Sequence, residues 1–241
     1  MRSNVVLETR SLSMHFGGVV AVDRVDFSLR ENELRCLIGP NGAGKSTFFK
    51  CITAQLRPTT GDVVIRDFNV TGSESHQVAR MGVGIKTQVP NVFDGLDVEE
   101  NIWLSASQSA SVKRARVITS EVIERLELGE VRKSPLGSLA HGQRQLGALG
   151  MVLAGEPWLV ILDEPTAGMT QDEVVRTADI IREINQSATM IVVEHDMQFI
   201  RMIAQKVTVF HQGKILVEGN MDEISSDHRV REVYLGHRKS S

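Results

Sequence analysis

Gly39-Pro40-Asn41-Gly42-Ala43-Gly44-Lys45-Ser46-Thr47 is the stretch of sequence that decides the fold. It fits the pattern G-x-x-x-x-G-K-[ST], in which glycines let the backbone curl and point successive N–H groups at phosphate oxygens. The run Leu34 to Ile38 before it is apolar almost throughout, as expected of a strand buried on both faces. Helical character follows from Ser46 to Leu56. The sequence therefore predicts a phosphate-binding loop between a buried strand and a helix N-terminus.

Single side chains of this loop have predictable roles. Lys45 is expected to reach the β- and γ-phosphates of a nucleotide, and the Ser46 hydroxyl to hold Mg²⁺. A chance glycine-rich turn is the alternative, but such a match is expected in only about 1% of chains of this composition. The expected phosphate-binding residues are Gly39, Asn41, Gly42, Ala43, Gly44, Lys45, Ser46 and Thr47.

Helices and strands alternate outside this loop. Apolar, β-branched runs predict strands at Val5–Leu7, Val19–Leu29, Gly61–Ile65, Leu159–Leu162, Met190–Val193 and Val207–Phe210. Residues 98–155 are expected to be mostly helical, and further helices are expected around 174–184 and at 196–205. This alternation is typical of an α/β fold with a parallel sheet flanked by helices.

Composition excludes several classes of protein. The chain has 241 residues, of which 41% are hydrophobic and 24% charged, so disordered and fibrous classes are excluded. A net charge of -3 argues against a charge-driven nucleic-acid partner. No apolar run approaches the ~18–20 residues that cross a bilayer, and the N-terminus lacks a secretory pattern. Cys36 and Cys51 are expected to be buried thiols in a reducing compartment, so we expect a soluble intracellular protein.

Two carboxylates follow the apolar run Leu159 to Leu162. Alternation along a strand sends Asp163 and Glu164 in different directions, so one can hold Mg²⁺ while the other polarises an attacking water. An ordinary acidic helix cap is the alternative. The phosphate loop earlier in the chain favours the catalytic interpretation.

Two further polar residues follow apolar segments. His195 comes after the run Met190 to Val193, and the carboxyl ends of strands in doubly wound sheets gather around the ligand. His195 is therefore a candidate for contact with a γ-phosphate, with a solvated loop residue as the alternative. Gln88 follows a shorter apolar segment and is a candidate donor to water or to Mg²⁺ ligands.

With these elements in this order, the chain resembles the ATP-binding cassette (ABC) ATPases over essentially its whole length. Leu139-Ala140-His141-Gly142-Gln143 is similar to the family's LSGGQ signature. Gln88 matches the Q-loop, Asp163-Glu164 the Walker B end and His195 the switch histidine. Phe16, before two glycines, matches the aromatic residue that stacks on adenine.

The resemblance implies an architecture and a set of site residues. It implies a P-loop NTPase core at residues 1–89 and 157–241, a helical subdomain at 90–156 and an antiparallel β subdomain. Glu164, His195 and Gln88 are the implied catalytic residues, and ATP is sandwiched between two head-to-tail subunits. Phe16 and the signature residues Ala140, His141, Gly142 and Gln143 are implied to contact ATP. Ser46, Gln88 and Asp163 are implied to hold Mg²⁺.

A finer likeness points to the ATPases of urea and branched-chain amino acid importers. It rests on Pro165–Thr170, Glu194–Met197, Thr208–Gly213, Val233–Gly236 and His141. The sequence Ala167-Gly168-Met169-Thr170 looks like the urea-importer variant, so urea is favoured over branched-chain amino acids. The implied partners are transmembrane permease subunits, a second ATPase subunit and, indirectly, a solute-binding protein. A different second subunit is favoured over a homodimer, and the implied location is peripheral, on the cytoplasmic face of the plasma membrane.

Two other functions are weighed against an importer ATPase. A cassette ATPase of DNA repair or translation normally has long coiled coils or two cassettes in one chain, and this chain has neither. A regulatory nucleotide-binding module without hydrolysis is opposed by the presence of Glu164 and His195. It is favoured only by Ala140, which replaces the signature serine.

Overall fold

The computed structural model describes residues 4–235. The chain forms two compact units, one running to Met81 and resuming at Thr189, the other spanning Gly82–Ala188. The helical subdomain predicted at 90–156 falls wholly inside the second unit. Gly236, the last residue of the Val233–Gly236 likeness, lies outside the described residues.

The first unit contains an antiparallel sheet in the order β2-β1-β4-β5. Its strands are β1 (Val5–Phe16), β2 (Val19–Arg30), β4 (Thr60–Ile65) and β5 (Phe68–Asn69). The antiparallel β subdomain implied by the sequence is therefore present. The prediction of a short first strand at Val5–Leu7 is wrong. Shifts in register let β1 bend and continue to Phe16 while Leu7 and Leu12 both stay fully buried.

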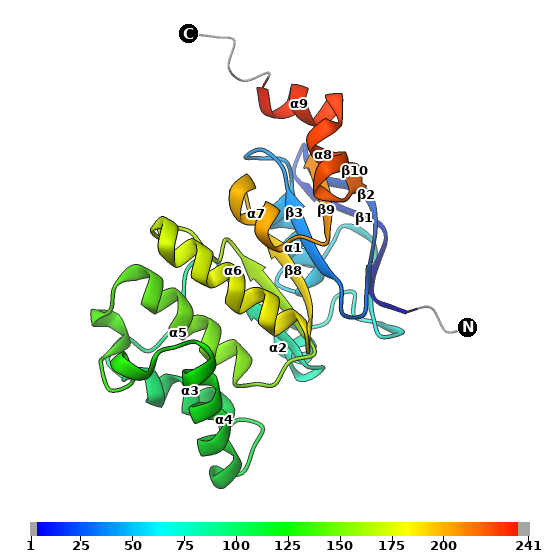
Figure 1. The fold of residues 1–241 in the computed structure, drawn as a ribbon. Helices are drawn as coiled ribbons and strands as arrows, with labels where there is room; N and C mark the ends of the chain where they lie inside the picture. Colours follow the sequence, from blue (N-terminus) through cyan, green and yellow to red (C-terminus); the bar gives the residue numbers. More distant parts are fainter. Residues whose placement is uncertain (1–3, 236–241) are drawn as a thin grey trace. The chain divides into compact units, whose positions relative to one another are not determined.

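The same unit contains parallel strands (Figure 1). β3 (Leu34–Ile38) lies between β8 (Thr189–Val193) and β9 (Lys206–His211), parallel to both, and β10 (Lys214–Gly219) pairs antiparallel with β9. Every residue of β3 and of β8 is buried, as their apolar sequences predict. The carboxyl ends of β3 and β8 therefore meet at the same edge.

One charged residue interrupts the apolar character of β3. Arg35 is only 1% exposed, and its guanidinium pairs with Glu33 at 2.6 Å and with Glu218 of β10. It also donates to the Thr208 hydroxyl at 2.8 Å and lies 5.0 Å from the centre of the Phe27 ring. This buried cation is tolerated because its donors are satisfied from several strands at once.

The described part of the first unit contains five helices: α1 (Lys45–Ile52), α2 (Ser75–Arg80), α7 (Met197–Ile203), α8 (Met221–Ser226) and α9 (His228–Leu235). α1 ends before the predicted Leu56. The Thr53 hydroxyl donates to the Phe49 carbonyl at 2.8 Å, and Ala54 adopts a left-handed φ of 55°, which stops the helix. α7 begins one residue later than predicted because Asp196 caps it, accepting from the Gln198 and Phe199 amides. It ends at Ile203, before the predicted residue 205, where Ala204 adopts an extended conformation.

The second unit contains two strands and four α-helices. They are β6 (Val83–Lys86), β7 (Leu159–Asp163), α3 (Val98–Ala106), α4 (Val112–Arg125), α5 (His141–Leu153) and α6 (Gln171–Asn185), with 3-10 turns at Gly129–Val131 and Leu136–Ser138. α3 packs against α4 and α5 (Figure 1). Ile102 and Leu126 are both fully buried there, and a Cβ on Gly150 of α5 would meet their side chains at 2.8 and 3.1 Å.

Candidate functional site

The predicted phosphate loop connects β3 to α1 in a conformation that glycine alone fits well. Gly39 has a φ of 150° and Gly44 a φ of 103°. A Cβ on Gly39 would lie 2.3 Å from the Phe210 carbonyl oxygen, and one on Gly44 would lie 2.4 Å from that of Ala21. Both neighbours are backbone atoms that cannot rotate away. The glycines therefore pack the loop directly onto β9 and β2.

Lys45 is the first residue of α1 and is only 8% exposed. Its ammonium donates to the carbonyl oxygens of Gly39 at 2.6 Å and Pro40 at 3.1 Å. The first turn of α1 has no acidic residue, so the positive end of its dipole is not offset there. Lysine and helix end together give the loop the positive potential that a phosphate requires.

α1 is anchored to the core beneath the loop. The Phe48 ring lies 5.4 Å from the Phe27 ring in a T-shaped pair and 5.1 Å from the Phe210 ring. Phe48 is fully buried, whereas the neighbouring Ser46 is exposed. The helix thus buries one face and leaves the Ser46 hydroxyl free to reach a ligand.

Two braces of the phosphate loop were not predicted from the sequence. The Gly213 amide, in the turn between β9 and β10, donates to the Ala43 carbonyl at 2.9 Å, and the Gly213 carbonyl accepts from Asp23 at 2.8 Å. Tyr234 of α9 lies beside the Gly39 backbone, and burial raises the pKa of its hydroxyl to about 12. The dipeptide Gln212-Gly213 is typical of a turn, but no neighbouring residue indicates that this turn contacts the phosphate loop.

Phe16 ends β1 in the same unit and is 47% exposed. Val19 and Val20, which begin β2, are also exposed, at 65% and 46%. An aromatic ring left in solvent at the tip of a hairpin is available to stack on a flat ligand.

His195 follows β8, and the pairing of Leu37 with Val193 places it at the same edge as the phosphate loop. Its side chain is 61% exposed. The neighbouring Glu194 is 1% exposed, and one of its carboxylate oxygens accepts from the His195 amide at 3.0 Å. Glu194 therefore shapes the turn that presents His195. This role could not be predicted from the sequence, because an acidic residue after a strand is usually solvated.

Gln88 and Glu164 come together in the second unit. β6 and β7 are parallel, with Lys86 opposite Leu162, so the residues that follow both strands meet at one edge. The Gln88 amide Nε2 donates to Glu164 Oε2 at 2.6 Å, a charge-assisted hydrogen bond. Glu164 adopts a left-handed φ of 45°, which is costly for a residue with a side chain and typical of functional turns.

The signature-like segment begins α5. Ala140 is the N-cap residue and provides no side-chain cap, and Gly142 is buried. A Cβ on Gly142 would meet a Glu173 carboxylate oxygen at 2.2 Å, and one on Gly168 would meet the His141 ring at 3.0 Å. The start of α5 is therefore packed against the segment leading into α6.

Glu173 was not singled out in the sequence. Its carboxylate accepts from the Thr170 amide at 2.8 Å and completes a capping box at the start of α6. The His141 ring contacts the Gln145 amide at 3.2 Å.

The predicted site residues thus fall into two groups. The phosphate loop, Phe16 and His195 belong to the first unit, whereas Gln88, Asp163, Glu164 and the signature-like segment belong to the second. Within residues 4–235, no three His, Cys, Asp or Glu side chains come close enough to hold a metal ion among them. The Ser46 side chain is exposed, and a hydroxyl oxygen is a type of ligand that Mg²⁺ accepts.

Together, the buried strand β3, the glycine-rich loop, the buried lysine and the start of α1 define a P-loop nucleotide-binding fold. A family model described as "ABC transporter" matches residues 22–167. The chain belongs to this family and is an ATP-binding subunit of the ABC transporter type, an ATPase that couples hydrolysis to transport. A second model, "Branched-chain amino acid ATP-binding cassette transporter", matches residues 214–240.

Two named relatives and one solved structure match this chain over nearly its whole length. The high-affinity branched-chain amino acid transport ATP-binding protein LivG of Escherichia coli is 32% identical, covering 97% of this chain and 99% of LivG. BraF of Pseudomonas aeruginosa, with the same description, is 29% identical over 97% of this chain and 99% of BraF. The ADP conformation of MJ1267, an ATP-binding cassette of an ABC transporter, has a TM-score of 0.86 at 25% identity, covering 96% of this chain and 99% of MJ1267.

None of the helices within residues 4–235 combines the length and the apolar character that crossing a membrane requires.

Proposed function

We propose that this chain is the ATP-hydrolysing subunit of an importer for branched-chain amino acids or urea. The observation that carries the proposal is the match of residues 214–240 to the branched-chain amino acid cassette model. It extends the likeness beyond the cassette shared by all ABC transporters. LivG and BraF, which match this chain over 97% of its length, are both named for the transport of branched-chain amino acids.

Nucleotide binding is assigned to the first unit. The phosphate loop from Gly39 to Thr47 surrounds the phosphates with backbone N–H groups, and Lys45 neutralises their charge. Release of Lys45 from the Gly39 and Pro40 carbonyls onto phosphate replaces two neutral acceptors with a charged one, which favours binding. Phe16 stacks on the adenine.

Hydrolysis is assigned to Glu164, which takes a proton from the attacking water. Its hydrogen bond to Gln88 keeps the carboxylate oriented, and a shift of Gln88 would change the availability of that oxygen. His195, presented by Glu194, contacts the γ-phosphate. Ser46, Gln88 and Asp163 are the residues that would hold Mg²⁺, and the ion would neutralise charge at the phosphates.

The partners follow from the proposed function. Two ATPase subunits close head to tail on ATP, so that the segment Leu139–Gln143 of one subunit faces the phosphate loop of the other. Transmembrane permease subunits carry the solute, a solute-binding protein delivers it outside, and this chain lies on the cytoplasmic face of the membrane. Ala140 lacks the signature hydroxyl, which favours a different ATPase subunit as the second member of the pair.

Urea and branched-chain amino acids have different observations in their favour. The segment Ala167–Thr170 favours urea. Gly168 of that segment is packed against His141, whose likeness is to the subgroup of urea and branched-chain amino acid importers as a whole. The named relatives and the C-terminal model favour branched-chain amino acids.

The test is uptake in a strain that lacks this chain and is complemented with it. Labelled leucine and labelled urea are supplied separately, with a Glu164→Gln variant as the control for hydrolysis. We expect uptake of one of the two solutes to be restored by the wild-type chain and not by the variant. Restoration of neither solute, or equal uptake with Glu164→Gln, would refute the proposal.

A further inference from the structure

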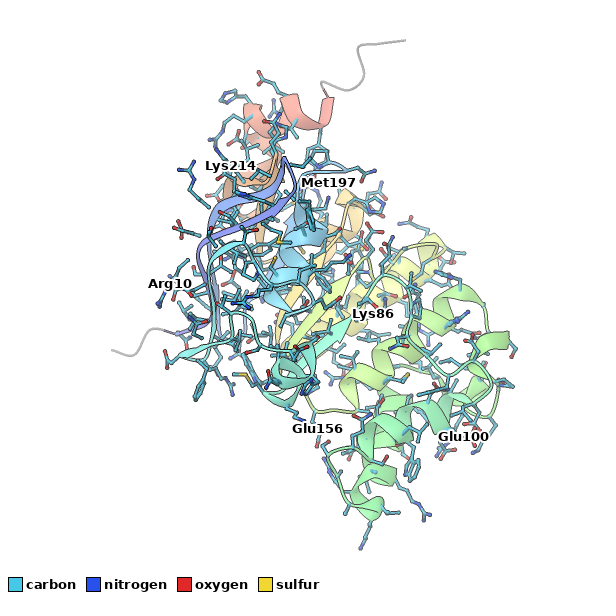
Figure 2. The ribbon with its side chains drawn as sticks, turned by 180° about the vertical axis from the view of Figure 1, so that it is seen from behind. Arg10, Lys86, Glu100, Glu156, Met197 and Lys214 are labelled. Carbon is cyan, nitrogen blue, oxygen red and sulfur yellow. The ribbon has the colours of Figure 1, made fainter. Side chains whose placement is uncertain are left out.

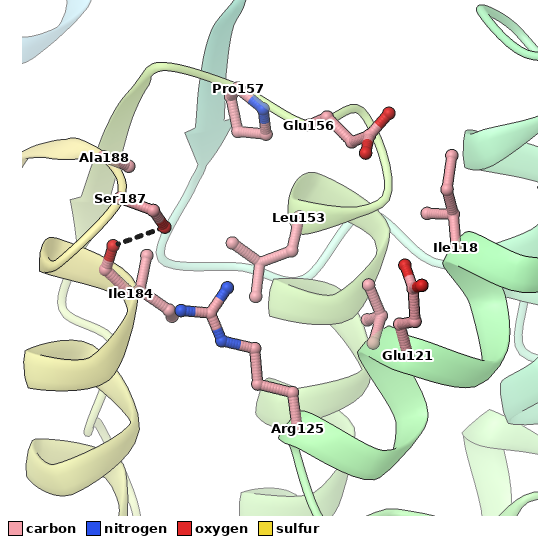
Figure 3. A pocket seen from close by; sticks show the side chains of 10 residues that line it. Ile118, Glu121, Arg125, Leu153, Glu156, Pro157, Ile184, Ser187 and Ala188 are labelled. Carbon is pink, nitrogen blue, oxygen red and sulfur yellow. Dashed lines mark hydrogen bonds between the residues drawn. The ribbon is translucent and has the colours of Figure 1, made fainter.

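A cavity of about 300 Å³ lies in the second unit, and none of the residues that line it is assigned to the nucleotide (Figure 3). It is formed where α4, the end of α5 and the end of α6 meet. Its volume is at the small end of the ~300–1,000 Å³ range of small-molecule sites. The size suits a ligand of about ten non-hydrogen atoms.

The cavity lies at the opposite edge of the strands from the Gln88–Glu164 contact. Glu156 and Pro157, which line it, come just before β7, whereas Glu164 comes just after β7. Five residues of strand separate these two ends by roughly 16 Å. A ligand in the cavity would therefore not touch the proposed catalytic groups.

One part of the cavity wall is aliphatic. Ile118 and Val122 from α4, Leu153 from α5 and Ile184 from α6 line it, and each is no more than 7% exposed. All four side chains are branched hydrocarbons without a polar atom. The wall accordingly offers a contact surface for a short aliphatic chain.

Opposite charges stand next to this wall and are kept from pairing with each other. Glu121 and Arg125 are one turn apart on α4, the spacing at which such side chains usually form an ion pair. Arg125 Nε instead lies 2.8 Å from Glu183 Oε1. Glu121 lies 3.8 Å from Arg114, which pairs with Glu156 at 2.6 Å. In Figure 3 the Arg125 guanidinium points into the cavity from one side, while Glu121 and Glu156 stand apart from it.

The surrounding backbone strengthens the acidic side. α5 ends at Leu153, three residues before Glu156, so the carbonyl end of α5, which carries partial negative charge, lies near Glu156. Glu156 lies between α5 and β7, three residues after the end of α5, and adopts a left-handed φ of 48° (Figure 2). The acidic side therefore suits an ammonium group.

We propose that this cavity binds a free α-amino acid with an aliphatic side chain, such as leucine. The Arg125 guanidinium receives the carboxylate in a forked contact, and Glu121 with Glu156 receives the ammonium. The side chain lies on Ile118, Val122, Leu153 and Ile184. Because an α-amino acid carries its two charges close together, it bridges the gap between Glu121 and Arg125 that the unliganded side chains leave open. The assignment rests on the chemistry of the cavity and holds whichever solute the transporter carries.

The test is a titration of the full chain, without nucleotide, followed by NMR of its isoleucine, leucine and valine methyl groups. With L-leucine we expect saturable shifts at Ile118, Leu153 and Ile184, with a dissociation constant on the order of 1 mM or tighter. Leucinamide, which lacks the carboxylate, and 4-methylpentanoate, which lacks the ammonium, should each bind at least 10-fold more weakly. Glycine, which lacks the aliphatic side chain, should also bind at least 10-fold more weakly than L-leucine.

Matched variants test whether leucine binding depends on the residues that line the cavity or only on the total charge of the protein. Arg125→Gln and Glu121→Gln should each weaken leucine binding by at least about 10-fold. Arg132→Gln removes a guanidinium that pairs with Glu99 at 2.6 Å but does not line the cavity, and it should leave binding unchanged. Thermal unfolding checks that each variant is folded. Absence of saturable shifts in the wild-type chain up to 20 mM leucine overturns the proposal. Binding of leucinamide or 4-methylpentanoate as tight as that of leucine also overturns it.

Discussion

Replacement of Ala140 by serine should have two separable effects, on the stability of the subunit and on its ATP-dependent association. Ala140 has the extended backbone of an N-cap residue, with φ -56° and ψ 152°, but no side-chain oxygen to cap α5. A serine here would accept from the amide of Gln143, which is three residues on. The side-chain carbonyl oxygen of Gln143 could then accept from the backbone N–H of residue 140, completing a capping box.

The size of the first effect follows from this geometry. Exchanging alanine for serine at an N-cap changes stability by about 0.5–2 kcal/mol. We expect Ala140→Ser to raise the free energy of unfolding by about 1 kcal/mol, measured by urea denaturation without nucleotide.

The second effect requires the hydroxyl itself. If the serine donates to the γ-phosphate of ATP held by a second subunit, one charge-assisted hydrogen bond worth ~1.5–3 kcal/mol is added. Association would then strengthen by about 10- to 150-fold. Sedimentation velocity with ATP and Mg²⁺, in a Glu164→Gln background that prevents turnover, measures this.

Ala140→Gly is the matched control, because glycine is a good N-cap residue without a hydroxyl. It should raise stability almost as much as serine and leave the association unchanged. A tight ATP-dependent homodimer of the Glu164→Gln chain with Ala140 in place would refute the reasoning. Equal strengthening of association by glycine and serine would show that the cap, and not the hydroxyl, is responsible.

Three further predictions address the phosphate loop, the base-stacking residue and a surface ion cluster. Lys45→Ala removes a buried cation and should weaken ATP binding by roughly 2–5 kcal/mol, at least about 30-fold, measured by equilibrium binding with Arg132→Gln as the control. Phe16→Ala should weaken ATP and GTP binding by similar factors, worth ~1–3 kcal/mol, because stacking discriminates poorly between bases; loss for ATP alone would exclude stacking. Hydrogen bonds from Arg132 and then Lys133 lower the pKa of Glu99 to about 2. The stability from this carboxylate is therefore present above its unfolded pKa of ~4.3 and is lost as the pH falls from about 5 to about 2. As the pH falls across that range, urea denaturation should show a larger loss of unfolding free energy for the wild-type chain than for Glu99→Gln. An equal loss in both proteins would contradict the assignment.

The sequence by itself determined the local parts of this protein. The phosphate loop and the fully buried strand β3 were both readable, because backbone conformation and burial there depend on the residues of the segment itself. The motif order Gln88, Leu139–Gln143, Asp163-Glu164 and His195 likewise sufficed to identify the family.

The tertiary structure decided what depends on residues far apart along the chain. The hydrogen bond from Gln88 to Glu164 exists because β6 and β7 pair in parallel with Lys86 opposite Leu162, a register that neither segment encodes alone. The burial of Arg35 among groups from several strands, and the bracing of the phosphate loop by Gly213, have the same origin. The cavity beside Arg125 is formed by the ends of three helices whose sequences show only ordinary amphipathic patterns. Local pattern specifies which face of an element is apolar, whereas strand register and helix packing specify which side chains meet.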